Sequence, residues 1–453
     1  MLLLAMCLAA GFVLRLYFLL RHPFLADDSL LYQDIALNWV HAHVYGLSSA
    51  TGPRPTLIRL PGYPAVLAVC ELMFGRWLHA DVGSLRSFMP VLWLQMFADL
   101  GTCWMVAAIA GRMAGERARL IALALACLCP FTANYVAVPM TETWVLLTIA
   151  VAFYAAQRWL AQQRMRWVVL LAAALACSVM LRPDQGLLAV AIVPLLLVGG
   201  GRRLQPAVLC VCLAALPFVP WTVRNLRTFG VVQPLAPKLA NDPGEMPPVG
   251  FQRWFRTWGI DFAATQDAYW NYPEELVVAG DLPTRAFDLA ALDGQTRTLL
   301  TQAGDAGKLD AVVDAGFAQM ARERVAARPF RYYVMLPCAR LVDMLLRPRV
   351  EMLPVSLRWW QWRTHMEETL WAGAYALLNL GYFLLAGFGL RRMRGPLAMA
   401  MVAFVLLRCA LLLTLDNAEQ RYTLEFFPVL VVFASAVWCT PAQRLHESLA
   451  KGL

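Results

Sequence analysis

Carboxylate and arginine side chains recur at the ends of the apolar segments of this 453-residue chain. A carboxylate can accept a proton from a nucleophile or hold a cation, and an arginine can bind phosphate through two parallel hydrogen bonds. Polar residues also occur at helix ends simply because water solvates them there, so no single position identifies a site. Ten positions are predicted to lie on one side of a membrane: Asp27, Asp28, Arg59, Glu142, Arg182, Asp184, Arg224, Asp416, Glu419 and Arg421. Together they predict a pocket that joins proton transfer to phosphate binding.

The segments between these positions are apolar enough to require lipid around them. Hydrophobic residues make up 60% of the chain and charged residues 15%, whereas a soluble domain is roughly 45 to 50% apolar and 25% charged. The first run, Met1–Leu20, carries Arg15 and no small-residue cleavage site, so we expect a retained helix rather than a signal peptide. The net charge of +9 is explained by arginines in short cytoplasmic loops. No nucleic-acid partner is therefore expected.

The apolar runs predict an all-α polytopic membrane protein with about ten transmembrane helices. The first helix is expected to end at about Leu20. The other nine are expected near 89–111, 118–138, 142–159, 167–181, 185–199, 206–222, 369–390, 397–415 and 422–439. The short apolar segment Tyr63–Phe74 begins beside Pro61 and Pro64, so we expect an interfacial or re-entrant helix that does not cross. The arginine clusters of the connecting loops then share one face, which the positive-inside rule makes cytoplasmic. These clusters are Arg112/Arg117/Arg119, Arg158/Arg164/Arg166, Arg202/Arg203 and Arg391/Arg392/Arg394, with Arg444 and Lys451 in the tail.

This topology divides the chain into three parts. Residues 1–223 form an N-terminal transmembrane module whose first outer loop, 21–87, carries candidate catalytic residues. Residues 224–368 form an extracytoplasmic insertion that ends in an amphipathic juxtamembrane helix. Residues 369–453 form the C-terminal transmembrane helices. We expect the protein in a bacterial-type inner (plasma) membrane, in contact with membrane lipids and with its site facing the periplasm or exterior.

Neither the cysteines nor the acidic residues predict a metal site. Most of the eleven cysteines lie inside apolar runs, and no histidine cluster accompanies them. Asp416 and Glu419 offer oxygen ligands for a divalent cation, but two separated acids are too few to predict one. Trp359, Trp360 and Trp362 precede a span, so they are expected to anchor the interface, with sugar stacking as the alternative.

Several short motifs, taken in order, resemble those of the GT-C glycosyltransferases. This superfamily includes the protein O-mannosyltransferases and the aminoarabinose transferases of lipid A. The motifs are Ala-Asp-Asp-Ser-Leu-Leu-Tyr-Gln-Asp-Ile-Ala at 26–36, Val-Tyr-Gly at 44–46, Arg-Leu-Pro-Gly-Tyr-Pro at 59–64, Thr-Glu at 141–142, Leu-Arg-Pro-Asp at 181–184, Pro-Trp-Thr-Val-Arg-Asn at 220–225, Phe-Gly at 229–230 and Arg-Tyr at 421–422. They extend over nearly the whole chain except the outer insertion.

The resemblance implies an enzyme that transfers a sugar from a polyprenyl-phosphate carrier to an acceptor hydroxyl, with inversion at the anomeric carbon. The acceptor is a lipid, a glycan or a protein. No cofactor is implied, and the sequence has no glycine-rich phosphate loop. A transporter or flippase of lipid-linked sugars is the alternative, because it too would need membrane-embedded charges. The absence of an internal repeat disfavours that alternative.

The resemblance also implies roles for individual residues. The family pattern places an aspartate four residues before a tyrosine, which selects Asp28 ahead of Tyr32 as the base. Many relatives have Asp-Glu where this chain has Asp27-Asp28. The alignment with the family pattern can therefore shift by one residue, which leaves Asp27 as an alternative base. Glu142 corresponds to a second acidic position, which would orient the acceptor or tune the base. The candidate ligands of the carrier phosphate are Arg59, Arg182, Arg224 and Arg421.

Overall fold

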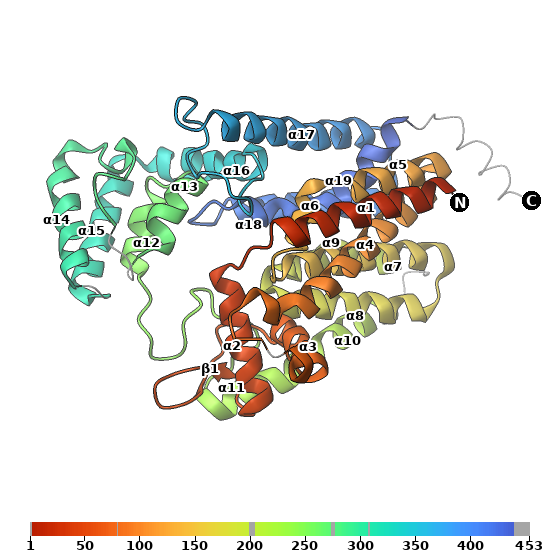
Figure 1. The fold of residues 1–453 in the computed structure, drawn as a ribbon, viewed down its shortest axis with the longest axis horizontal. Coiled ribbons are helices and arrows are strands. Elements are labelled where there is room, and N and C mark those ends of the chain that lie inside the picture. Colours follow the sequence, from red (N-terminus) through yellow and green to blue (C-terminus); the bar gives the residue numbers. More distant parts are fainter. Residues whose placement is uncertain (1, 79, 199–203, 273–276, 307–308, 439–453) are drawn as a thin grey trace, which may run out of the picture.

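The computed structural model describes residues 2–78, 80–198, 204–272, 277–306 and 309–438 as an assembly of helices with one two-stranded sheet (Figure 1). The first half contains α1 (Leu2–Arg21), α2 (Asp27–His41), β1 (Gly46–Leu47), β2 (Arg54–Pro55), α3 (Gly62–Leu78), α4 (Leu85–Ala114), α5 (Glu116–Cys127), α6 (Pro130–Tyr135), α7 (Glu142–Gln162), α8 (Met165–Leu181), η1 (Pro183–Gln185), α9 (Gly186–Ile192), η2 (Val193–Leu197), α10 (Gln205–Ala215) and α11 (Phe218–Phe229). The second half contains α12 (Val249–Arg256), α13 (Phe262–Ala264), η3 (Thr265–Trp270), η4 (Thr284–Ala286), α14 (Ala290–Ala306), α15 (Ala311–Ala327), η5 (Arg331–Met335), α16 (Leu336–Leu346), α17 (Met366–Leu390), α18 (Pro396–Leu412), η6 (Gln420–Phe426), α19 (Phe427–Ser435) and η7 (Ala436–Trp438).

Among the residues that the structure describes, six helical segments are long and apolar enough to cross a membrane, judged by length and composition. They are Leu2–Arg21, Leu85–Ala114, Glu142–Gln162, Gln205–Phe229, Met366–Leu390 and Gln420–Trp438, and three shorter apolar segments are Met165–Leu181, Pro183–Leu197 and Pro396–Leu412. These segments lie at nine of the ten predicted spans. The prediction of an all-α polytopic membrane protein is therefore confirmed.

The one remaining predicted span, 118–138, is not one continuous helix in the structure. α5 ends at Cys127, and Pro130 starts the separate short helix α6, because proline has no backbone N–H and cannot continue an α-helix. Arg15 of α1 reaches into this break. Its Nη1 donates to the carbonyl oxygen of Cys127 at 2.6 Å, and its Nη2 donates to that of Ala126 at 3.3 Å. Asp99 of α4 balances the buried charge of Arg15, with an oxygen 2.5 Å from Nη2.

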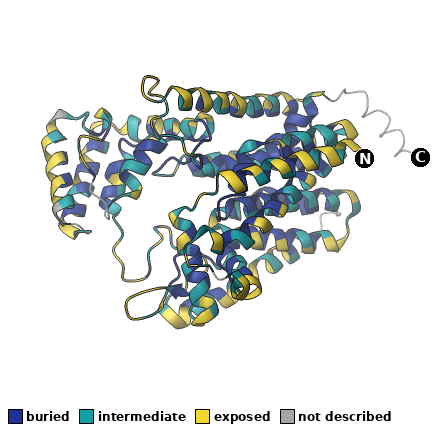
Figure 2. Ribbon diagram, viewed as in Figure 1, coloured by how far each residue is buried: buried dark blue, intermediate teal, exposed yellow. Residues whose placement is uncertain are grey.

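The helices of the bundle share one large hydrophobic core, in which α4 packs against α5 and α7, and α7 packs against α8. Outward faces remain apolar and exposed (Figure 2). α1 exposes Leu2 and Val13, and α17 exposes Leu377 and Leu384. Such apolar faces are expected where lipid tails surround a helix, which agrees with a membrane bundle.

The two ends of the bundle differ in what they carry. The amino terminus, the α7–α8 turn and the end of α17 lie at one end, and α2, α11 and the insertion lie toward the other (Figure 1). The turns at the first end contain several of the predicted cytoplasmic arginines, including Arg164 and Arg392. At the opposite end, α2 packs against α3, and the rings of Tyr32 and Tyr63 meet edge to face at 5.1 Å.

The insertion has a hydrophobic core of its own. Aromatic residues of α12, including Phe251 and Trp254, pack against Phe317 of α15. An ion pair of 3.1 Å joins Arg256 at the end of α12 to Asp416 in the loop after α18. The insertion is thereby fixed to the end of the bundle that carries the candidate site.

Candidate active site

Asp28 is bound by two arginines from opposite ends of the chain. It lies in the first turn of α2, where the helix dipole favours a negative charge. Its Oδ1 accepts a hydrogen bond from Nη2 of Arg59 at 2.8 Å, and its Oδ2 accepts one from Nη1 of Arg421 at 3.1 Å. Arg59 belongs to the loop before α3, and Arg421 belongs to η6. The fold thus brings together a carboxylate and two guanidinium groups that the sequence analysis assigned to one pocket.

The two guanidinium groups control the proton affinity of Asp28. Burial alone would raise the pKa of its carboxyl, but the charges of Arg421 and Arg59 outweigh burial and lower that pKa to about 2. Burial raises the pKa of the neighbouring Tyr32 hydroxyl to about 12. Asp28 is therefore ionised at physiological pH, but while both arginines hold it, it is a weak proton acceptor.

A second charged cluster adjoins the first. Nη1 of Arg182 lies 3.3 Å from an oxygen of Glu142, and its Nε lies 3.4 Å from Asp184 and 3.6 Å from Glu425. Arg408, which is fully buried, bridges Asp184 at 2.5 Å and Glu425 at 2.9 Å. Three carboxylates therefore surround two guanidinium groups, so this cluster has no unbalanced positive charge.

The ring of Tyr422 joins the two clusters. The guanidinium carbons of Arg182 and Arg421 each lie 5.5 Å from its centroid. Beyond Arg421 lies Glu419, which is only 4% exposed and forms an ion pair with that arginine. The indole Nε1 of Trp270, from the insertion, donates to Oε1 of Glu419 at 2.9 Å. The candidate site therefore draws on the first outer loop, the bundle and the insertion.

Five of the seven predicted site residues meet in these clusters: Asp28, Arg59, Glu142, Arg182 and Arg421. Asp27 starts α2 beside Asp28, but it forms no ion pair with any residue that the structure describes.

Arg224 is not brought into either cluster. Its Nη2 donates to the carbonyl oxygen of Tyr45 at 2.6 Å, and its Nη1 donates to that of Thr56 at 2.7 Å. The rings of Tyr45, Trp221 and Phe229 surround its guanidinium. These contacts fasten α11 to the loop around β1 and β2. The assignment of Arg224 as a ligand of the carrier phosphate stays a prediction.

Arg408 and Glu425 were missed in the sequence. Each is a single ionisable residue within a predicted span, at 397–415 and 422–439. A charge inside a hydrocarbon core is costly enough to suggest a functional partner, so this signal was present. Trp270 carried no comparable signal, because only the docking of the insertion brings it to Glu419.

The acidic residues considered for a divalent cation are bound to arginines. Asp416 pairs with Arg256, and Glu419 pairs with Arg421. Within the described ranges, no group of three or more histidine, cysteine or acidic residues is arranged to hold a metal ion.

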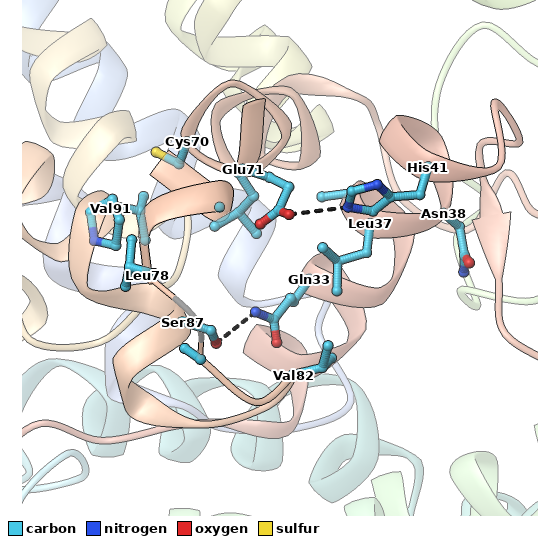
Figure 3. Close-up of a pocket in the computed structure, with 15 residues that line it drawn as sticks. Gln33, Leu37, Asn38, His41, Cys70, Glu71, Leu78, Val82, Ser87 and Val91 are labelled. Atoms are coloured by element: carbon cyan, nitrogen blue, oxygen red, sulfur yellow. Dashed lines mark hydrogen bonds and ion pairs between the residues drawn. The ribbon is translucent and has the colours of Figure 1, made fainter. Parts of the chain in front are cut away.

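A cavity of about 310 Å³ lies between α2, α3 and the start of α4 (Figure 3). The Nε2 atom of His41 lies 3.0 Å from an oxygen of Glu71 across it, and the amide of Gln33 donates to the hydroxyl of Ser87 at 2.8 Å (Figure 3). None of the seven predicted site residues lines this cavity. The candidate site is therefore the pair of charged clusters.

Comparisons with known proteins agree with the motifs. Residues 73–223, which include Glu142 and Arg182, match a family described as dolichyl-phosphate-mannose-protein mannosyltransferase. The fold is similar to that of the Archaeoglobus fulgidus oligosaccharyltransferase in complex with zinc and sulfate, with a TM-score of 0.51 and 12% identity. That similarity covers 99% of this chain and 50% of the oligosaccharyltransferase, so this chain corresponds to half of the archaeal protein.

ArnT from Cupriavidus metallidurans bound to undecaprenyl phosphate aligns at a TM-score of 0.40 and 14% identity, over 100% of this chain and 80% of ArnT. The sequence matches no curated protein. The family match over residues 73–223 agrees with the resemblance that the motifs predict, and the similarity to the archaeal protein shows a shared fold.

Proposed function

We propose that the protein is an inverting glycosyltransferase that moves a sugar from a polyprenyl-phosphate carrier to an acceptor hydroxyl at the outer face of the membrane. One observation carries this proposal: Asp28, a proton acceptor, lies in direct contact with the two cationic groups of Arg59 and Arg421. The matched family is named for a sugar linked to dolichyl phosphate, which supports a carrier of the same chemical class.

The reaction that fits this geometry is an in-line displacement. The acceptor oxygen attacks the anomeric carbon as the bond from that carbon to the phosphate oxygen breaks, and the electron pair leaves with the phosphate. Asp28 takes the proton of the acceptor hydroxyl, because a neutral hydroxyl is a poor nucleophile. Arg59 and Arg421 neutralise the charge that develops on the leaving phosphate.

In this proposal a bound phosphate competes with Asp28 for the N–H groups of these two arginines. Donor binding would draw their N–H groups toward the phosphate oxygens and release the Asp28 carboxylate. Loss of these partners raises the pKa of Asp28 toward its ordinary value. In this proposal Asp28 therefore becomes an effective base only when the donor is bound.

The second cluster would support the first. Arg182 already contacts Glu142, Asp184 and Glu425, so we assign to it mainly the placement of Glu142. Glu142 would then orient the acceptor hydroxyl toward Asp28. The ring of Tyr422 contacts both Arg182 and Arg421 and would hold the two clusters in fixed positions relative to each other.

Reconstitution tests the proposal. The purified full chain in liposomes is supplied with undecaprenyl-phosphate-linked sugars and with an extract of cell-envelope lipids, glycans and proteins, and mass spectrometry follows the sugar. We expect the sugar to become covalently attached to one acceptor class, with inverted anomeric configuration. Movement of the lipid-linked sugar between leaflets without transfer to any acceptor would contradict the proposal and favour a flippase.

A further inference from the structure

The insertion brings one half-exposed tryptophan to the charged site. Trp270 is 49% exposed, yet its Nε1 donates to Glu419, a carboxylate that is almost fully buried. Glu419 pairs with Arg421, and Arg421 pairs with Asp28. The indole is therefore two ion pairs from the proposed base, with its polar edge held by Glu419 and the residue half exposed.

The backbone of this segment is arranged to hold the indole there. Thr265–Trp270 forms a π-helical turn, a rare geometry that is frequent at functional sites. In an α-helix, residues five apart point roughly 140° away from one another, whereas the wider π-helix brings them closer to one face. Thr265 and Trp270 accordingly contact adjacent residues of one loop: Thr265 Oγ1 accepts from the backbone N–H of Ala418 at 3.2 Å, and Trp270 donates to Glu419.

Other tryptophans of the chain are placed differently. Trp254 and Trp258 are fully buried within the core of the insertion, where they supply packing area. Trp362 is 51% exposed, but in the described part of the chain its indole nitrogen has no hydrogen-bond partner in the charged clusters. The hydrogen bond of Trp270 to Glu419 helps to dock the insertion and also holds a half-exposed indole beside the charged clusters.

We propose that the open face of Trp270 is a stacking platform for a sugar ring at this site, which rests on the proposed glycosyl transfer. The C–H groups on one face of a sugar ring are apolar and slightly positive, and the face of an indole is apolar and slightly negative. Glu419 also accepts from Asn417 and from the hydroxyl of Tyr422, so its oxygens fix the indole and do not need to bind the sugar. The platform is thus assigned to Trp270 rather than to Trp359, Trp360 or Trp362.

Comparing ligands with and without a sugar isolates the contact. With the full chain in lipid nanodiscs, dissociation constants are measured for undecaprenyl phosphate and for undecaprenyl phosphate carrying mannose, glucose or arabinose. The ratio of the constants without and with a sugar gives the contribution of that sugar. A second arm measures binding of methyl mannoside and methyl glucoside by saturation-transfer NMR, with undecaprenyl phosphate present. The variants are Trp270→Leu, Trp270→Phe and, as a control of matched exposure, Trp362→Leu.

We expect Trp270→Leu to reduce the sugar contribution about three- to ten-fold in one arm, while binding of undecaprenyl phosphate itself changes little. Trp270→Phe should retain part of the contribution because it keeps an aromatic face, and Trp362→Leu should retain all of it. A loss in the first arm assigns the platform to the donor sugar, and a loss in the second assigns it to an acceptor sugar.

An unchanged sugar contribution in both arms for a well-folded Trp270→Leu protein would overturn the platform. It would leave the proposed transfer untouched, provided that undecaprenyl phosphate binds. Failure of the wild type to bind undecaprenyl phosphate would instead count against the proposed donor site, and the methyl glycosides would still decide the role of Trp270.

Discussion

At the scale of single residues, the proton affinity of Asp28 depends on what else its two arginines bind. With both guanidinium groups in contact, the pKa of its carboxyl is about 2. A phosphodiester competes for the same N–H groups, because a phosphate oxygen and a carboxylate oxygen make the same kind of charge-assisted hydrogen bond. Donor binding and protonation of Asp28 should therefore be thermodynamically linked.

The linkage predicts proton uptake on donor binding. The free protein has the lower pKa at Asp28, so the complex holds more protons mainly around pH 3, between a pKa of about 2 and the ordinary value of 3.8, and affinity rises as pH falls through this window. Calorimetry with farnesyl methyl phosphate, whose single charge does not titrate in this range, measures the uptake in buffers of different ionisation enthalpy. Asp28→Asn should abolish the uptake, and Glu71→Gln, at an ion pair outside the site, should not. Equal uptake in wild type and Asp28→Asn would refute the linkage.

The two arginines should contribute directly to the affinity for the carrier. Arg59→Ala or Arg421→Ala should weaken binding of undecaprenyl phosphate by about one to two decades, the value of a charge-assisted hydrogen bond of roughly 1.5 to 3 kcal/mol. Lysine should restore part of the affinity, because it supplies charge without the planar fork. Arg54→Ala, at an exposed arginine of the same outer loop, is the control. Unchanged affinity in both alanine variants would remove the phosphate from this site.

Sequence reasoning located residues at this scale better than it assigned their partners. The sequence placed Asp28, Arg59 and Arg421 in one pocket because few side-chain types serve as a base or bind phosphate, and the structure brings the three into contact, while their roles stay predictions. Arg224 is the same residue type at the same bilayer end, but its donors are occupied by backbone carbonyls. Which arginine keeps N–H groups available for a phosphate depends on its contacts with residues distant in the sequence, and residue type does not reveal those contacts.

At the scale of elements, a buried ion pair supports the break between α5 and α6. The carbonyl groups at the end of a helix have no intrahelical partners, and in lipid they cannot be left to water. Arg15 supplies donors to Ala126 and Cys127, and Asp99 balances its charge. Gly11 leaves the necessary room, because a Cβ at this position would lie 2.8 Å from the Cβ of Cys127.

Arg15→Ala should therefore destabilise the bundle strongly. It leaves Asp99 as an unpaired buried charge and removes one hydrogen bond from each of the carbonyl groups of Ala126 and Cys127, and removal of one partner of a buried pair costs about 3 to 5 kcal/mol. The thermal unfolding midpoint in detergent should fall well below that of wild type. Arg112→Ala, at an exposed arginine near the carboxyl-terminal end of α4, should shift the unfolding midpoint little. Equal midpoints for the two variants would show that the pair does not support the break.

The break between α5 and α6 was not predicted from the sequence, which indicated a single span over 118–138. The run 118–138 is mostly apolar, and a proline such as Pro130 does not by itself exclude a continuous transmembrane helix, because neighbouring helices can satisfy the freed backbone groups. The decisive contacts come from Arg15 and Asp99, on other helices. The other predicted spans are matched by apolar helices because their length and composition suffice to define them.

At the scale of the whole molecule, the charged clusters and the arginine-rich turns lie at opposite ends of the bundle. This separation predicts that the loops near Arg117, Arg164 and Arg392 face the cytoplasm and that those near Glu142, Arg182 and Asp416 face outward. Single cysteines placed in these loops, in a protein without its native cysteines, can be tested with a membrane-impermeant reagent on intact cells. Labelling of the loop near Arg117 from outside would invert the topology and place the site on the wrong face.

The docking of the insertion could not be predicted from the sequence. Its contacts with the bundle, Arg256 with Asp416 and Trp270 with Glu419, join residues about 150 positions apart and follow no local pattern. Its own aromatic core is visible as composition, but the surface that meets the site is set by tertiary packing.

The rate of sugar transfer by Asp28→Asn, measured with saturating donor, tests the central claim most directly. Asparagine keeps the size of the side chain but cannot take a proton, so transfer should fall by roughly two to four decades while the variant still binds undecaprenyl phosphate. Asp27→Asn, one residue away and without an ion pair in the described structure, should retain most of the rate. A reversal of these two results would move the base by one residue and keep the mechanism. Wild-type rates in both variants and in the double variant would contradict the account.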